Sequence, residues 1–220
     1  MRRFYSLILL LFSFFFVSCL KESSKIQNQG SKANYQPVTA GSEWNYRVSG
    51  TSNYIYSVRA EDRDSIINGK SYRVFSNNKD PYEYYFKTGG DYYRFGSPEE
   101  FNYQPIDLLY IRDYLNPGEE WLEVKTIKLG GLPVSAEVTI KILEKDIEYT
   151  VNDILYKKVI HLLVTPKFIG GSFIPIGSES DIHYYYADSV GFIYNKTSLQ
   201  VPIANVNINK ETKLVSYTIK

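Results

Sequence analysis

The sequence is poor in the residues that most often carry covalent or metal chemistry. Its 220 residues include one cysteine, two histidines, one methionine and two tryptophans. A single cysteine excludes an internal disulfide, so stability must come from an ordinary packed core, which a chain of this length can build. The 25 basic and 24 acidic residues nearly cancel, and the chain therefore lacks the basic footprint of a nucleic-acid-binding protein.

Motifs of common active sites are also missing. There is no phosphate-binding glycine loop or dinucleotide fingerprint, and neither Ser172 nor Ser178 lies in a Gly-x-Ser-x-Gly nucleophile elbow. Asp181 and His183 would share one face of a strand, but spacing identifies no third ligand for a metal. His161 lies in an apolar, strand-like run, where a local hydrogen bond is enough to satisfy it. We therefore predict no catalytic, cofactor-binding or metal-binding residues and no enzymatic activity.

The N-terminus has the layout of a secretory signal. Arg2 and Arg3 precede fourteen mostly apolar residues, 4–17, which are followed by the small residue Ser18 and by Cys19. As a helix, fourteen residues span about 21 Å, which is short of the ~30 Å hydrocarbon core of a bilayer. A membrane-spanning anchor is therefore disfavoured. It stays an alternative, as does a conventional signal peptide with an unrelated cysteine.

A lone cysteine directly after that small residue resembles the lipobox of bacterial lipoproteins. In that family the cysteine sulfur receives a diacylglyceryl group, the peptide is cut before it, and the new N-terminus is acylated. The resemblance implies a signal peptide at residues 1–18 and a lipid on Cys19 that attaches the protein to a membrane. Leu20 stands where an aspartate would retain a lipoprotein at the inner membrane. The resemblance thus implies the outer membrane, with the periplasmic or surface face left open.

Removal of the signal would change the charge only slightly and would expose a polar segment. The first 18 residues contain two basic and no acidic residues, so the mature chain carries a net charge of −1. Residues 19–36 are mostly Lys, Glu, Ser, Gln, Asn and Gly, a composition typical of flexible linkers. We predict a lipidated tether at 19–36 and one folded domain at 37–220.

The folded domain is predicted to be all-β. Short runs rich in aromatic and β-branched residues alternate with turn signals, such as Asn68-Gly69 between two such runs. Apolar and polar residues alternate along residues 134–150, which is the period of a half-buried strand. Only residues 106–114 could form a short helix, and the prolines on either side allow an extended crossover equally well.

The domain also carries a predicted internal repeat. Both tryptophans lie in a Gly-x-Glu-Trp frame, at 41–44 and 118–121, and each frame precedes an asparagine turn and then an aromatic strand. A β-protein rich in tyrosine and glycine can also produce such similarities by chance. We predict two related antiparallel β-meanders, at about 37–100 and 114–200, followed by a C-terminal strand. Together they would form a strongly curved sheet, a half-barrel or a partly open barrel.

Several short segments resemble a group of small bacterial lipoproteins. The mature domain opens with Pro…Gly-x-x-Trp-x-Tyr, here residues 37–46, and carries Tyr-Tyr-Ala-x-x-Val-Gly near its C-terminus, here residues 185–191. A final strand like residues 213–217 completes the resemblance. These motifs are short and structural, so the resemblance implies no particular activity.

Tyrosine is the commonest aromatic residue, with 21 copies. On a curved sheet a tyrosine can bury its ring and leave its hydroxyl in water, or it can line a groove for a ring-stacking ligand. We select Tyr84, Phe86, Tyr184 and Tyr186 as candidate ligand-face aromatics. The sequence predicts a non-enzymatic cell-envelope lipoprotein that binds an envelope glycan, a lipid or a protein partner. The alternatives are a structural or assembly subunit of an outer-membrane complex and, with less support, an enzyme acting on envelope polysaccharide.

Residues 165–177 form an apolar stretch interrupted by glycine and proline. The pattern predicts a long loop, which either folds back over an open end of the sheet or makes contacts with a partner. We favour the folded-back arrangement, because isoleucine and phenylalanine between glycines can cover exposed apolar side chains.

Lipidation of Cys19 can be tested directly in a bacterial host. The wild-type protein should fractionate with membranes, and mass spectrometry of its N-terminal peptide should show more than one long acyl chain, which is enough for stable anchoring. Cys19→Ser should leave the chain uncut before residue 19 and without lipid, whereas Ser23→Ala should behave as wild type. An unmodified Cys19 in a protein recovered from the aqueous fraction would contradict the prediction.

Overall fold

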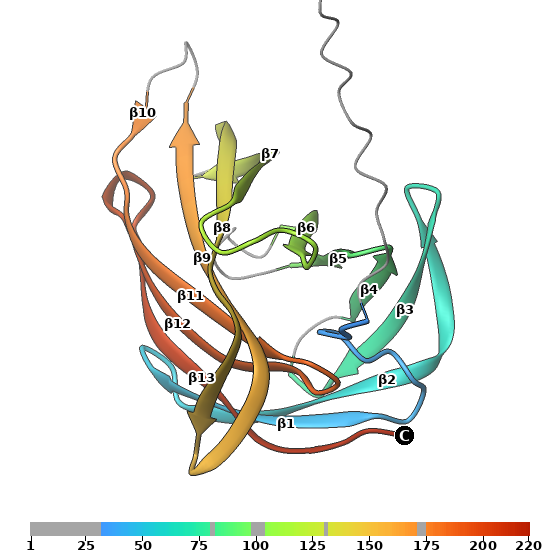
Figure 1. The fold of residues 1–220 in the computed structure, drawn as a ribbon. Coiled ribbons are helices and arrows are strands. Elements are labelled where there is room, and N and C mark those ends of the chain that lie inside the picture. The colour runs from blue at the N-terminus through green and yellow to red at the C-terminus, as the bar shows by residue number, and fades with distance from the viewer. Residues whose placement is uncertain (1–31, 80–81, 98–103, 130–131, 171–174) are drawn as a thin grey trace, which may run out of the picture.

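The computed structural model describes residues 32–79, 82–97, 104–129, 132–170 and 175–220 (Figure 1). The predicted signal peptide, Cys19, most of the predicted tether and Ser172 lie outside the described residues. Regular structure in the described part is β-strand except for one 3-10 turn at Pro202–Ala204. The all-β prediction is confirmed. None of the described segments forms a helix suited to crossing a lipid bilayer.

The strands follow one another with short connections. In chain order they are β1 (Glu43–Gly50), β2 (Tyr54–Ile67), β3 (Lys70–Asn77), β4 (Glu83–Thr88), β5 (Asp91–Gly96), β6 (Ile106–Arg112), β7 (Glu120–Leu129), β8 (Leu132–Val151), β9 (Ile154–Ile169), β10 (Pro175–Ile176), β11 (Glu179–Ala187), β12 (Gly191–Val201) and β13 (Val206–Thr218).

These strands belong to one antiparallel sheet. Its order is β6-β5-β4-β3-β2-β1-β13-β12-β11-β9-β8-β7, with the short β10 added to β9. The two halves of the chain join in the middle of this order, where β1 pairs with β13. The sheet curls until its edge strands, β6 and β7, lie near each other (Figure 1). The result is a barrel with one unsealed seam, as expected for a partly open barrel.

Each half of the chain contributes six main strands in the same relative order. The two tryptophans of the repeated frame lie on the first strand of their halves, β1 and β7. Asn68 and Asn152 begin the turns between the second and third strands and have φ values of 51° and 49°. Tight hairpins need this left-handed conformation, and asparagine tolerates it better than most residues. The interpretation as a repeat stays a prediction, and the matching strand order agrees with it.

Side chains bridge the seam where backbone pairing stops. The amide of Gln104 donates to the carbonyl oxygen of Lys128 (2.6 Å) and accepts from the Lys128 backbone N–H (2.7 Å). These are the two hydrogen bonds that a neighbouring strand would make with that residue. Nearby, the Trp121 indole N–H of β7 donates to the Leu109 carbonyl oxygen of β6 at 2.9 Å. Within the described residues, the two edge strands are therefore linked across the seam by side-chain hydrogen bonds and not by a backbone ladder.

The segment ahead of β1 packs inside the barrel, between β5 and the β11–β12 turn (Figure 1). Tyr35 is fully buried. The Tyr92 hydroxyl donates to the Ala33 carbonyl oxygen at 2.9 Å, and the Asn34 N–H donates to Asp188 Oδ1 at 2.8 Å. The last residues of the predicted 19–36 tether are thus part of the folded body. Composition alone missed this because the aromatic ring that holds the segment is surrounded by polar residues.

β8 and β9 form a hairpin that is longer than the other strands. Their pairing shifts register at several points between Ile142 and Tyr149, and such shifts bend a strand pair. Beyond the bend the tip of the hairpin reaches β13, where the Asn152 side-chain amide donates to the Leu214 carbonyl oxygen at 2.8 Å. The hairpin therefore braces the wall formed by the C-terminal strands.

Two segments that we did not predict as strands contain them. β9 continues to Ile169, so the first part of the predicted 165–177 loop is paired backbone. The end of that stretch forms β10, which pairs with β9, and residues 171–174 lie outside the described residues. Residues 106–112 form β6 instead of a short helix. The helix alternative is wrong, because the segment pairs with β5 along its length and its alternate residues Ile106, Leu108 and Tyr110 line the interior.

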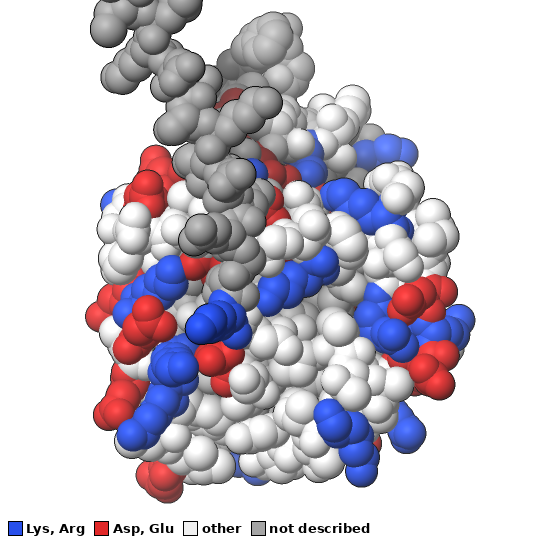
Figure 2. Space-filling model, turned by 45° about the vertical axis from the view of Figure 1, so that its right-hand side comes forward, with Lys and Arg blue, Asp and Glu red and all other residues white. Residues whose placement is uncertain are grey.

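Alternation along the strands places the core inside the barrel. Val138, Ile140 and Ile142 of β8 have no exposed surface, which confirms the half-buried strand predicted there. In β12 every second residue from Gly191 to Val201 is buried. The outer surface carries charged side chains of both signs, which lie intermixed on the face drawn in Figure 2.

The side-chain bridge at the seam should make a measurable contribution to the free energy of unfolding. Gln104→Leu should lower the free energy of unfolding by about 0.5–1.5 kcal/mol, because it removes two hydrogen bonds. It should also speed hydrogen exchange of the Lys128 amide, which loses its acceptor. Gln200→Leu, an exposed glutamine on the fully paired strand β12, is the matched control. Equal protection of Lys128 in both variants would show that Gln104 does not bridge the seam in solution.

Candidate functional site

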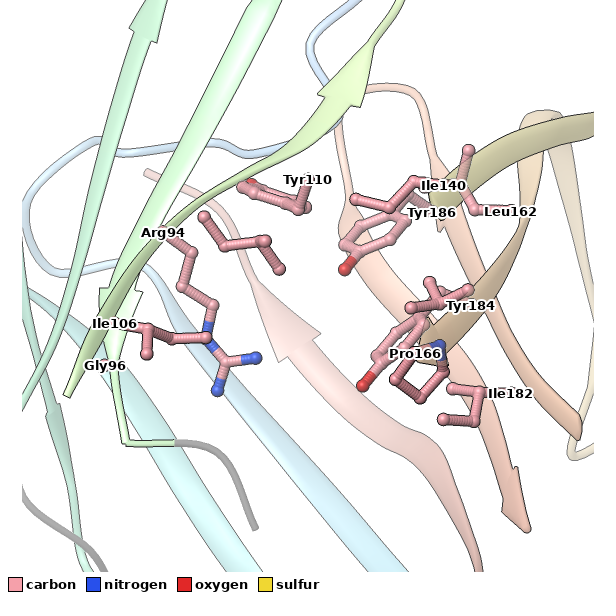
Figure 3. A pocket seen from close by; sticks show the side chains of 12 residues that line it. Arg94, Gly96, Ile106, Tyr110, Ile140, Leu162, Pro166, Ile182, Tyr184 and Tyr186 are labelled. Atoms are coloured by element: carbon pink, nitrogen blue, oxygen red, sulfur yellow. The ribbon is translucent and has the colours of Figure 1, made fainter. Parts of the chain in front are cut away.

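The barrel interior is not completely filled by side chains. A cavity with about 680 Å³ of empty space, part of it open to solvent, lies between β5 and β6 on one side and β8, β9 and β11 on the other (Figure 3). We call it the apolar cavity, and its lining consists of Arg94, Gly96, Ile106, Leu108, Tyr110, Ile140, Leu162, Val164, Pro166, Ile182, Tyr184 and Tyr186.

A second hollow, here called the polar cavity, adjoins the first. It holds about 520 Å³ of empty space, part of it open to solvent, and is lined by Gln36, Trp44, Tyr46, Tyr56, Val58, Phe75, Glu83, Tyr85, Arg94, Tyr184, Tyr186 and Phe192. Arg94, Tyr184 and Tyr186 line both cavities. These three side chains therefore form the boundary between an aliphatic chamber and a more polar one.

An ion pair lies at this boundary. Arg94 Nη2 donates to Glu83 Oε1 at 3.0 Å, and the Tyr85 hydroxyl donates to Glu83 Oε2 at 2.5 Å. The hairpin of β4 and β5 produces the arrangement, because its Gly89-Gly90 turn places Tyr85 opposite Arg94. Glu83 lies two residues before Tyr85 on the same face of β4. Both oxygens of the carboxylate are thus engaged.

The Arg94 guanidinium keeps unused hydrogen-bond donors. Burial by itself would lower the pKa of Arg94, but the Glu83 carboxylate and the phenols of Tyr85, Tyr184 and Tyr186 together outweigh it and hold the pKa well above its usual value. The group is therefore always charged. Its Nε is buried and has no hydrogen-bond partner among the described residues, and Nη2 is its only nitrogen with a partner in the described part of the chain. Arginine presents five N–H donors, so several are available to a ligand.

The phenols around the cavities are neutral. Burial raises the pKa of Tyr46, Tyr85 and Tyr110 well above the usual value. In Figure 3 the hydroxyls of Tyr184 and Tyr186 point from the opposite wall toward Arg94. The site can therefore hold an apolar body in the aliphatic chamber and a hydrogen-bonding group at Arg94.

The four predicted ligand-face aromatics do not come together. Tyr184 and Tyr186 line both cavities. On β4, however, Tyr85 faces the interior, so Tyr84 and Phe86 point to the opposite, outer face. The sequence repeat suggested equivalent positions in the two halves, but a shift of one residue along a strand exchanges the faces.

Arg94 and Glu83 were not predicted as site residues from the sequence. The signal that could have found them was the Gly89-Gly90 turn, because a two-residue hairpin loop fixes which residues lie opposite each other. It would have placed Arg94 opposite Tyr85, beside Glu83 on the same face. What the turn could not indicate is that this face is the interior of a barrel.

Both histidines of the chain belong to a second polar cluster, away from the cavities. Glu144 Oε2 lies 2.8 Å from His161 Nδ1, and His161 Nε2 lies 2.8 Å from His183 Nδ1. His183 Nε2 lies 2.7 Å from Asp181 Oδ1, whose other oxygen accepts from Lys196 Nζ at 2.7 Å. The chain of contacts links β8, β9, β11 and β12. Asp181 and His183 do lie together, as their spacing predicts. The register between β9 and β11, which brings His161 to them, could not be predicted from the sequence.

The three contacts of this histidine cluster outnumber the N–H groups of two neutral rings. If both carboxylates only accept, three hydrogen bonds require three N–H groups, and two neutral imidazoles supply two. Burial lowers the pKa of His161, and the hydrogen bond with Glu144 opposes this effect. A positive charge on His183 would act in the same direction as burial. All four ring nitrogens are engaged, and no group of three His, Cys, Asp or Glu side chains within the described ranges is arranged to hold a metal ion. The cluster serves to fasten the bent β8 to its neighbours.

Comparison of the chain with protein-family models, with curated proteins and with solved structures gave no match. The functional argument for this protein therefore rests on the geometry of the two cavities.

The histidine cluster predicts a pH dependence of stability. Because the folded-state pKa of His161 is lowered, the unfolded chain binds more protons below its own pKa of about 6.5. The free energy of unfolding should fall as the pH is lowered through 6.5, as measured by urea denaturation at pH 7.5 and 5.5. His161→Gln should reduce this loss, whereas His183→Gln, which keeps His161, should retain more of it. The lowered pKa of Asp181 acts only at more acidic pH. An unchanged pH dependence in His161→Gln would rule out this assignment.

Proposed function

We propose that the protein is a non-enzymatic, lipid-anchored protein of the bacterial cell envelope that binds a small apolar or amphiphilic molecule inside its barrel. The observation that carries this proposal is the apolar cavity. Its wall is made of inward-facing, mostly apolar side chains from both halves of the chain, with one charged group among them.

The chemistry of the lining favours a lipid-like ligand over a glycan. Among the described residues that line the apolar cavity, Arg94 is the only charged one, and aliphatic side chains such as Ile140, Leu162 and Ile182 dominate. A sugar brings many hydroxyls, and each hydroxyl buried without a partner is costly. An acyl chain has no such cost and gains from the removal of its surface from water.

The proposed location agrees with such a ligand. A lipid on Cys19 would hold the barrel beside a membrane, where amphiphilic molecules are concentrated. The segment at residues 32–38 connects the proposed tether to the barrel interior, so the binding body would stay close to its attachment.

A glycan-cleaving enzyme has less support. Most glycosidases need two carboxyl groups about 5–10 Å apart across the scissile bond. Among the described residues lining the two cavities, Glu83 is the only carboxylate, and it is already paired with Arg94.

A second candidate function, a subunit of an envelope complex, draws on the outer wall. Leu122 and Val124 of the edge strand β7 are 54% and 57% exposed. Exposed apolar residues on an edge strand suit contact with another protein. This function requires no ligand in the cavity, so filling the cavity should leave it intact.

Binding can be tested with the neutral apolar dye Nile red and a pair of neighbouring variants. Val164→Trp places an indole in the apolar cavity, whereas Thr165→Trp places one on the exposed face of the same strand. The wild type and Thr165→Trp should enhance dye fluorescence with similar affinity, and Val164→Trp should bind roughly tenfold more weakly or not at all. Circular dichroism checks that both variants fold. Equal dye affinity in the two variants would place the binding elsewhere.

A further inference from the structure

We infer that the ligand of the apolar cavity is an uncharged amphiphile with a carbonyl head group, an ester or an amide, which accepts hydrogen bonds from Arg94, and that Glu83 excludes fatty-acid anions from the same position. This inference rests on the proposed function and specifies the chemistry of its ligand.

Arg94 has hydrogen-bond donors that the described residues leave unused. The buried Nε of Arg94 has no hydrogen-bond partner among the described residues, and only Nη2 is bonded in that part of the chain, to Glu83. A buried N–H without an acceptor is costly, and the cost is larger for a charged group. A ligand that brings an acceptor atom to the guanidinium would remove that cost.

A single ion pair balances the charge of the described cavity lining. Among the described residues that line one or both of the cavities, Arg94 is the only cation and Glu83 the only anion. Their separation of 3.0 Å makes the pair neutral as a unit. A ligand carboxylate would add a second negative charge beside Glu83 with no second cation to balance it. Like charges in a poorly solvated site repel strongly, and burial of an unbalanced charge is unfavourable. A neutral carbonyl oxygen can accept from the guanidinium without this cost.

The positions of Arg94 and of the aliphatic side chains define the orientation of such a ligand. Arg94 projects into the hollow, and the aliphatic side chains of Ile140, Leu162 and Ile182 line the wall across from it (Figure 3). A head group at Arg94 therefore leaves an acyl chain in contact with these residues. The hydroxyls of Tyr184 and Tyr186 also point toward the position of the head group.

The experiment compares two molecules that differ only in the head group. Methyl dodecanoate and dodecanoate, at pH 8 where the free acid is ionised, are used to displace Nile red from the full-length protein. The ester should displace the dye at concentrations roughly tenfold lower or more, because a charge-assisted hydrogen bond is gained without an unbalanced anion. Equal displacement by the two molecules, or stronger displacement by the acid, would overturn the inference and leave the proposed function standing.

Variants of the ion pair identify the cause. Glu83→Gln should shift the ratio of ester to acid affinity by about tenfold or more toward the acid, because Arg94 then has an unpaired positive charge. The exposed Glu120→Gln is the matched control and should leave the ratio at its wild-type value. The double variant Glu83→Gln/Arg94→Gln, which removes both charges and so avoids an isolated one, should weaken ester binding by about tenfold. Its Nile red binding shows that the cavity is intact.

The possible results distinguish a failure of the inference from a failure of the proposed function. An unchanged ratio in Glu83→Gln would show that Glu83 does not select against anions and would overturn the inference. Failure of the wild-type protein to bind Nile red, the ester and the acid would overturn the proposed function itself.

Discussion

Pairing of β1 with β13 makes one barrel out of two six-stranded halves. The contact joins the ends of the folded chain, since the Lys220 N–H donates to Ser42 Oγ across a sequence separation of 178 residues. The entropic cost of closing a loop rises only slowly with its length, and a ladder along the whole of β1 offsets it. The cavities depend on this pairing, because Arg94 comes from the first half and Tyr184 and Tyr186 from the second.

The ion pair inside the barrel agrees better with the proposed binding than with a role in stability. A partly buried ion pair contributes little net stabilisation, because desolvation of the two charges cancels much of their attraction. Glu83 and Arg94 nevertheless lie where the aliphatic and polar chambers meet, and Tyr85 completes the hydrogen bonding of the carboxylate. A chain that needed only a core could place apolar residues there.

Local rules of sequence were enough for the strands and their turns. The Asn68-Gly69 turn and the alternation along β8 are fixed by residues close together in the chain, so they could be predicted. The facing of Tyr84 and Phe86 could not, because a shift of one residue exchanges the two sides of a strand. The meeting of His161 with its partners depends on the register between β9 and β11, which is set by the whole barrel. The burial of Tyr35 likewise depends on contacts with distant strands.

The seam has a mechanical consequence for the wall. Elsewhere around the barrel, neighbouring strands can separate only by breaking a ladder of backbone hydrogen bonds. Between β6 and β7 the link consists of a few side-chain contacts and of the connecting residues 113–119. The barrel wall is therefore easiest to deform at the seam, which borders the apolar cavity through Ile106 and Leu108. Widening of the barrel there would break fewer hydrogen bonds than at any paired strand, and the connecting residues would limit its extent.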